Sequence, residues 1–221
     1  MIYYFWMITM SLREKIVSLP RYALIGYFAP LIALLGIITA IALSPNFLWT
    51  DNALSDLGHY TRTDLGGPQL VVAIIFNGSL ITTAILVMYA VFRLFREFND
   101  QLTKIALGLF FIATIFLMSI GIFSENFGYL HFIVSVGFFL SFPWTMWIIA
   151  IRWIKSPSLR MVSVLFIFMP FISILLWLTP LPTEVFGWTG VAIPEISTAL
   201  TAIIWLWIFI YYKESGKLEV L

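Results

Sequence analysis

The chain contains no cysteine and little charge, since only 10% of its 221 residues are Asp, Glu, Lys or Arg. Without cysteine there are no disulfides, no thiolate metal ligands and no cysteine nucleophile. A soluble domain carries about 25% charged residues, so this chain has too little polar surface to cover a core in water. Its net charge of +1 offers no basic surface for a polyanion, which excludes nucleic acid as a partner.

Long apolar runs take the place of the missing charge, and 62% of the residues are hydrophobic. A bilayer core about 30 Å thick needs about 20 consecutive apolar residues in a helix. Strands of a membrane barrel would be about half that length and would alternate polar with apolar residues, which these runs do not. The sequence therefore predicts an all-α polytopic membrane protein, a single domain over residues 1–221 with a bundle of six transmembrane helices. The predicted spans are 23–43, 70–92, 105–123, 130–151, 161–181 and 190–212.

The basic residues predict the orientation of the bundle. Eleven of the twelve Lys and Arg residues lie in the N-terminal segment, the second and fourth loops and the C-terminal tail, and only Arg62 lies on the opposite side. By the positive-inside rule, both termini are cytoplasmic and the protein is expected in the cell membrane. Six acids lie on the outer face. Their position there is the counterpart of the positive-inside rule and needs no functional explanation. They are Asp51, Asp56, Asp64, Glu125, Glu184 and Glu195.

The predicted domain has three parts: an extension over residues 1–20, the helix bundle over 21–213 and a cytoplasmic tail over 214–221. Within the extension, Ser11 and Glu14 form a capping-box pattern that predicts a short helix along the inner membrane surface, ending at Pro20. Met7 and Met10 are alternative start positions to Met1.

The first outer loop, residues 44–69, is unusually long for a compact protein, and such loops are often functional. Residues 49–60 predict a short interfacial helix with Thr50 or Asp51 as its N-cap and Gly58 as a left-handed C-terminal residue. On this hypothesis the loop supplies candidate site residues. The alternative is that its polar residues cap a turn or face water. The loop candidates for ligand binding or catalysis are Asp51, Asn52, Ser55, Asp56 and His59.

The only two histidines, His59 and His131, both fall on the outer side. Together with Asp56 or Glu125 they are candidates for a zinc site, because three such ligands leave one position for water. However, the spacing matches no metal motif, and a histidine near a helix end often bonds a backbone carbonyl. We therefore expect no metal and no other cofactor, and zinc is the alternative.

Two further polar residues lie inside predicted spans. Glu195 is a first-turn acid at the interface if its helix starts at Pro194, or an intramembrane ionisable group if the helix starts near Gly190. Asn77 is expected either to hold helices together or to bind a ligand in an outward-facing pocket. The small pairs 78/82 and 79/83 beside it predict close helix packing.

Several of these landmarks together resemble a known family. The element Asn-Ala-Leu-Ser-Asp-Leu-Gly at 52–58, Phe-Asn-Gly at 76–78, His131 and the pair Pro194–Glu195 are similar to the prokaryotic membrane proteins catalogued as domain of unknown function 998. The resemblance covers roughly residues 22–212 and departs from the family pattern at Ser124, where many members are expected to have proline. It implies a six-helix membrane fold and no particular reaction.

Three functions fit these observations. The first is an accessory or small-ligand or lipid-binding protein with an outward-facing polar site, whose partners are membrane lipids and other membrane subunits. The second is a membrane-embedded hydrolase or transferase acting on a lipid or isoprenoid head group at the outer leaflet. Its catalytic candidates are Asp56 and Glu125 as acid and base, His131 as base or metal ligand, Ser55 as nucleophile or substrate contact, and Glu195 as an orienting carboxylate. The third is a small transporter or channel.

Overall fold

A computed structural model describes residues 18–178 and 189–218 of the chain. These residues form six long helices and two short 3₁₀ turns, with no strand among them. Each long helix is long and apolar enough to cross a membrane, which confirms the prediction of a multi-pass all-α protein. Most of the predicted inner interfacial helix, and the end of the fifth predicted span, lie outside the described residues. The long helices are α3 (Arg21–Ala42), α4 (Gln69–Glu97), α5 (Gln101–Ile122), α6 (Tyr129–Trp153), α7 (Arg160–Leu178) and α9 (Ala192–Glu214).

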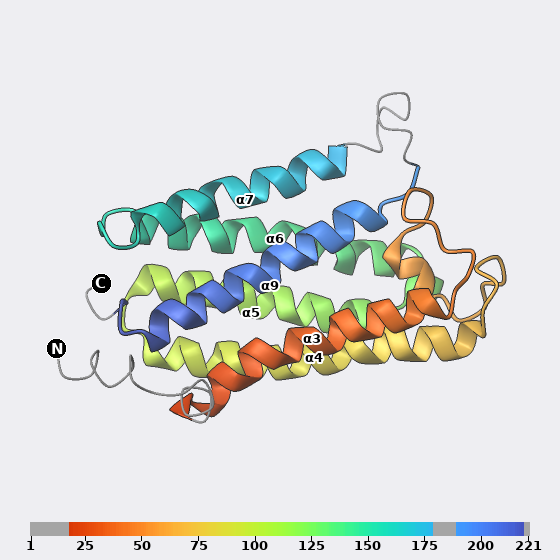
Figure 1. The fold of residues 1–221 in the computed structure, drawn as a ribbon, viewed down its shortest axis with the longest axis horizontal. Coiled ribbons are helices and arrows are strands. Elements are labelled where there is room, and N and C mark those ends of the chain that lie inside the picture. Colours follow the sequence, from red (N-terminus) through yellow and green to blue (C-terminus); the bar gives the residue numbers. More distant parts are fainter. Residues whose placement is uncertain (1–17, 179–188, 219–221) are drawn as a thin grey trace.

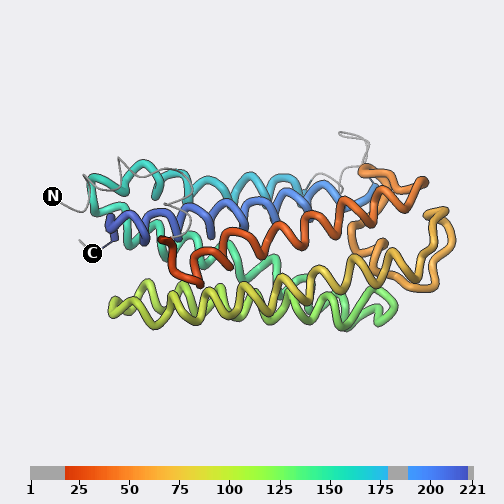
Figure 2. The backbone as a smooth tube through the Cα atoms, turned by 60° about the horizontal axis from the view of Figure 1, so that its bottom comes forward, coloured from red at the N-terminus to blue at the C-terminus, as the bar shows by residue number. Residues whose placement is uncertain are grey.

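The helices run antiparallel to their neighbours in the chain, so the polar connections collect at two ends (Figure 1). We call the end formed by residues 43–68, 123–128 and 189–191 the loop end, and the opposite end the terminal end. Figure 2 shows α4 and α5 along one side of the bundle, with α3, α9 and α7 following one another on the other. Helix α9 contacts α7, α3 and α6, so the last span closes the bundle.

Two helix boundaries lie away from the predicted spans, and a local cap explains one of them. Helix α5 begins at Gln101 because the carboxylate of Asp100 accepts a hydrogen bond from the backbone nitrogen of Thr103 at 2.9 Å. The other Asp100 oxygen accepts from Nε of Arg152 at 3.1 Å. Both contacts lower the pKa of Asp100, although burial opposes them. Helix α4 continues to Glu97, with Arg96 in a last turn where the helix dipole favours a cation.

The predicted close packing at the second span holds for one of its two small pairs. Ser79 is buried against Gly36 of α3, where an added Cβ would overlap the serine side chain. The hydroxyl of Thr83 donates to the carbonyl oxygen of Ala29 at 3.0 Å. At Gly78, by contrast, an added Cβ would meet no atom of the described chain within 4 Å, so the 78/82 pair faces away from α3.

Two apolar clusters fill the bundle. The cluster near the terminal end is rich in aromatic rings, and the centroids of Phe110 and Trp205 lie 4.9 Å apart. The cluster near the loop end includes Leu54, Leu57 and Leu65 of the first loop, so this loop is part of the core. Many large apolar side chains remain exposed along the helices, as expected for surfaces that face lipid.

Candidate functional site

The first loop folds into the loop end of the bundle instead of lying along its surface. Its only helical turn is η1 (Leu54–Gly58), shorter than the predicted 49–60 helix. The predicted caps are wrong, because neither Thr50 nor Asp51 caps this turn and Ala53 stands at its N-cap. Gly58 is not left-handed either, since the described glycines with positive φ are at other positions. A glycine is needed at 58 because an added Cβ would lie 2.6 Å from Oδ1 of Asn77.

Side chains of α4 bind the backbone of η1. Nδ2 of Asn77 donates to the carbonyl oxygen of Gly58 at 2.9 Å, and Nε2 of Gln69 donates to that of His59 at 2.8 Å. These bonds satisfy carbonyl groups that the short turn leaves without helical partners. Asn77 therefore holds the loop in place together with Gln69, a residue that no sequence motif singles out.

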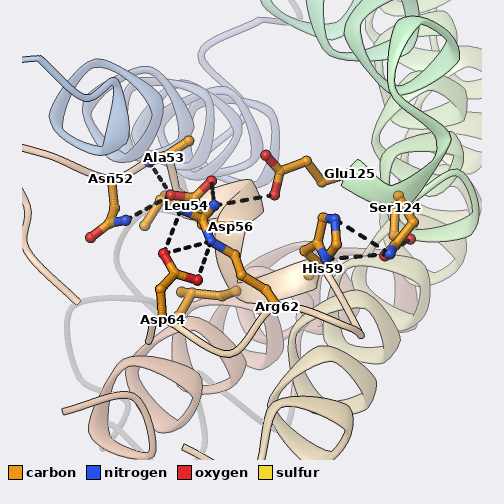
Figure 3. Close-up of polar contacts among 12 residues, drawn as sticks. Asn52, Ala53, Leu54, Asp56, His59, Arg62, Asp64, Ser124 and Glu125 are labelled. Carbon is orange, nitrogen blue, oxygen red and sulfur yellow. Dashed lines mark hydrogen bonds and ion pairs between the residues drawn. The ribbon is translucent and has the colours of Figure 1, made fainter. Parts of the chain in front are cut away.

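Asp56 is the centre of a buried polar network (Figure 3). One of its oxygens accepts hydrogen bonds from Nδ2 of Asn52 at 2.8 Å and from the backbone nitrogen of Ala53 at 3.1 Å. The other pairs with Nη1 of Arg62 at 2.5 Å. Oδ1 of Asn52 in turn accepts from the backbone nitrogen of Leu48 at 2.9 Å. Asp56 and Asn52 thus shape the loop, and both acceptor oxygens of Asp56 are in use.

Arg62 gathers three carboxylates, and we call Arg62, Asp56, Asp64 and Glu125 the Arg62 cluster. The guanidinium binds Asp64 through two parallel contacts of 2.8 and 2.9 Å, and its Nη1 lies 3.8 Å from Oε2 of Glu125. The guanidinium lowers the pKa of Asp64, and the hydrogen bond to Asp64 raises the pKa of Arg62. The cluster carries more negative than positive charge.

Glu125 is the least well compensated member of the Arg62 cluster. It lies in η2 (Glu125–Phe127), between α5 and α6, and its Oε2 is buried without a hydrogen-bond donor from the described residues. Burial raises the pKa of Glu125 to about 7, and the nearby carboxylate of Asp56 adds to this effect, while Arg62 opposes it. Glu125 therefore exchanges its proton near neutral pH.

The start of α9 also joins the first loop. Oε2 of Glu195 accepts a hydrogen bond from the backbone nitrogen of Leu54 at 2.5 Å. The backbone nitrogens of Gly190 and Ala192 donate to the carbonyl oxygens of Thr50 and Asn52 at 2.7 and 2.9 Å. The helix begins at Ala192, between the two predicted starts, so Glu195 lies in its first turn.

Gly190 and Asp51 complete this junction. A Cβ on Gly190 would overlap backbone atoms of Asn52, so only glycine permits the close approach of the two segments. Asp51 is exposed, and its Oδ1 accepts a hydrogen bond from the hydroxyl of Thr189 at 3.3 Å.

His131 connects the end of α5 to α6. Its Nδ1 lies 2.7 Å from the carbonyl oxygen of Phe123, and it is 8% exposed. Since a carbonyl only accepts, Nδ1 carries the hydrogen, and Nε2 of the neutral ring has a free lone pair. The hydroxyl of Ser135, one helical turn later, lies 3.3 Å from Nε2 and donates to it. His59 is elsewhere, next to Nδ2 of Asn126.

Three of the predicted site residues meet at one cavity of about 60 Å³, which we call the loop-end cavity. At about 15 Å³ for each molecule, it has room for about four waters. Its polar lining is Ser55 from η1, His131 and Ser135 from α6, and Glu195 from α9. The rest of the lining is apolar and comes mainly from α3, α4, α5 and α6.

The other predicted candidates do not line this cavity. Asp56 and Glu125 belong to the Arg62 cluster, Asn52 and Asn77 bind the loop, and Asp51 faces solvent. Ser135 was expected only as part of a transport path and not as a ligand-binding or catalytic residue, although its spacing of four from His131 is a usable signal for a shared helix face. Within residues 18–178 and 189–218, no three His, Asp or Glu side chains are grouped so as to hold a metal ion.

Comparison with known proteins adds a family match. A family model described as "Protein of unknown function (DUF998)" matches residues 27–212. This match confirms the resemblance carried by the motifs around Asn52, Asn77, His131 and Glu195. No curated protein and no solved structure matches the chain.

Proposed function

Since the chain belongs to the DUF998 family of proteins of unknown function, we propose its role from the loop-end cavity: it binds the polar end of a membrane amphiphile. The observation that carries this proposal is the convergence of four polar side chains from three elements on a cavity with otherwise apolar walls. Ligand sites in proteins have this composition, with mostly apolar walls and a few polar groups that orient the ligand.

Size and position support an amphiphile over a water-soluble metabolite. A cavity of about 60 Å³ admits a small polar group but not a whole metabolite. The apolar residues around it belong to helices that face lipid, so an attached hydrocarbon chain would find apolar contacts. In the predicted orientation the cavity lies in the outer half of the cell membrane, and outer-leaflet lipids would supply the ligand.

The first loop would act as the cover of this site. Leu57 is fully buried, and η1 is held by Asn77, Gln69 and Glu195 from two different helices. Non-helical backbone at membrane depth is tolerated where it is buried in protein or lines a cavity, and η1 meets both conditions.

A thiol-protection experiment tests the proposal, because the natural chain has no cysteine. Ser55→Cys places a single thiol in the cavity wall, and Thr63→Cys places one on the exposed loop as a control. Twelve-carbon amphiphiles with amine, trimethylammonium, hydroxyl and carboxylate heads would be tested against N-ethylmaleimide. At least one is expected to slow labelling of Ser55→Cys about tenfold without slowing Thr63→Cys. If none does, the proposal is wrong.

A second candidate function, hydrolysis of a lipid ester, is favoured by the pair of His131 and Ser135. The lone pair of Nε2 faces the serine hydroxyl, and Nδ1 is oriented by a carbonyl, as a general base for a nucleophile requires. This version of the enzyme hypothesis uses Ser135 in addition to Ser55. Covalent labelling by a fluorophosphonate that is lost in Ser135→Ala, but kept in Ser141→Ala, would support it.

The third hypothesis, transport, finds little support among the described residues. A polar path would include Asn77, Ser119 and Ser135. Asn77 and Ser119 bind the backbone carbonyls of Gly58 and Ile115, and of the three only Ser135 lines the loop-end cavity. The half of the bundle near the terminal end is filled with aromatic side chains, including Trp205, which is fully buried.

A further inference from the structure

The polar groups of the loop-end cavity are mostly hydrogen-bond acceptors, and no Lys or Arg of the described chain lines it. We propose that the group bound there is a primary ammonium, carried by the head of a membrane amphiphile. The inference rests on the proposed function and adds the chemical class of the ligand.

Glu195 can accept more hydrogen bonds than the described residues supply. A carboxylate offers about four lone-pair positions, and Glu195 has one donor among the described residues, the backbone nitrogen of Leu54. Ionising a carboxyl group among apolar side chains is costly without a positive partner, so Glu195 becomes a carboxylate most readily when a cation binds beside it. The arginine at this end of the bundle, Arg62, is already engaged by three other carboxylates. A cation from outside the protein would supply the missing partner.

The direction of the hydrogen bonds around His131 also favours a ligand with N–H donors. In a neutral ring whose Nδ1 donates to the carbonyl of Phe123, Nε2 is an acceptor, and Ser135 then uses its proton to bond it. The oxygen of Ser135 then keeps lone pairs to accept with, and Ser55, which also lines the cavity, has a hydroxyl oxygen that can accept as well. A primary ammonium has three N–H donors, and Glu195, Ser135 and Ser55 give it three acceptors.

The other common lipid head groups fit the lining of the loop-end cavity less well than a primary ammonium. A phosphate or carboxylate would find no lysine or arginine in the described lining to bind it, and its negative charge would oppose ionisation of Glu195. A trimethylammonium group has no N–H donor, and its three methyl groups add bulk in a cavity of about 60 Å³. The excess of acids in the neighbouring Arg62 cluster adds to the preference for a positive ligand.

The same amphiphile panel tests the inference. In Ala199→Cys, which places the thiol at an apolar position of the cavity wall and leaves the three acceptors in place, dodecylamine is expected to protect at a concentration at least tenfold lower than dodecyltrimethylammonium, which matches its charge and chain. Dodecanoate is expected to protect least. Adding Glu195→Gln, which keeps an acceptor for Leu54, should remove the preference for dodecylamine, whereas adding Asp51→Asn, at an exposed acid of the same face, should leave it unchanged.

A second variant keeps the test decisive if Glu195→Gln does not fold. Adding Ser135→Ala removes one of the three acceptors and should lower the preference for dodecylamine severalfold. Bilayer nanodiscs then identify the source of the ammonium group. Protection in phosphatidylethanolamine but not in phosphatidylcholine points to a lipid head group. Equal labelling in both lipids points to a free amine. Equal protection by all heads, or a preference for dodecanoate, would overturn the inference and leave the proposed function standing. No protection by any head would overturn both.

Discussion

Replacing Glu125 with glutamine tests whether the carboxyl group of this Arg62-cluster residue stays protonated well above its usual pKa. Glu125 shares one guanidinium with Asp56 and Asp64, and its buried Oε2 has no hydrogen-bond donor in the described parts of the chain. Burial and the charge of Asp56 raise the pKa of Glu125 from 4.5 to about 7. Between these two pH values the folded protein keeps a proton that the unfolded chain has lost. Stability therefore falls as the pH rises through this window and levels off above pH 7.

The size of the effect follows from the pKa. One pKa unit corresponds to about 1.4 kcal/mol, so a rise from 4.5 to about 7 gives an upper limit of about 3 kcal/mol. The Glu125 side chain is 31% exposed, and solvent screening reduces this figure to about 1–2 kcal/mol. Glu125→Gln has no charge to acquire, so it should match the wild type near pH 4.5 and exceed it in stability by that amount at pH 8.

Thermal unfolding of detergent-purified protein between pH 4.5 and 8 measures this difference. For a chain of this length, about 1 kcal/mol corresponds to about 2–4 °C in Tm. The variant should therefore unfold about 2–8 °C higher than the wild type at pH 8. Asp51→Asn, which removes an exposed acid from the same end, serves as the control and should follow the wild type. Parallel Tm curves for Glu125→Gln and wild type over the whole range would refute the reasoning.

Three further substitutions test how the first loop is held, each by Tm in detergent. Asp56→Ala leaves a guanidinium and two N–H donors without their buried partner and should cost about 3 kcal/mol; a loss under about 1 kcal/mol would contradict this. Gly190→Ala should lower Tm by several degrees because of its clash, whereas Gly108→Ala, with open space around it, should not; equal effects would remove the packing argument. Asn77→Ala loses the bond to Gly58 and should cost about 1 kcal/mol, and an unchanged Tm would mean that this bond does not hold the loop.

The six spans could be predicted from the sequence because the membrane imposes a strong local requirement. Each span needs about 20 apolar residues, and this composition is visible without knowledge of any contact. The helix ends were less predictable, since the start of α5 depends on Asp100 acting as an N-cap. The first loop was predicted least well, because it is buried and its shape depends on Gln69 and Asn77 of α4 as well as on bonds within the loop.

The candidate site was predictable only in part. Glu195, His131 and Ser55 stood out because polar groups are rare near spans, and the structure places them around one cavity. Asp56 and Glu125 stood out for the same reason, but their link to Arg62 could not be read from the chain. Arg62 drew notice only as the exception to the positive-inside rule. Contacts such as that between Leu54 and Glu195, 141 residues apart, leave no local pattern in a single sequence.

The junction between the first loop and α9 also sets the order in which the protein can be completed during synthesis. The carbonyls of Thr50 and Asn52 and the N–H of Leu54 are bound by residues 189–195, near the end of the chain. At about 5–20 residues per second, the 141 residues between Leu54 and Glu195 take about 7–28 s to emerge from the ribosome. Until then the first loop lacks these partners, so its junction with α9 forms only after α9 has been synthesised.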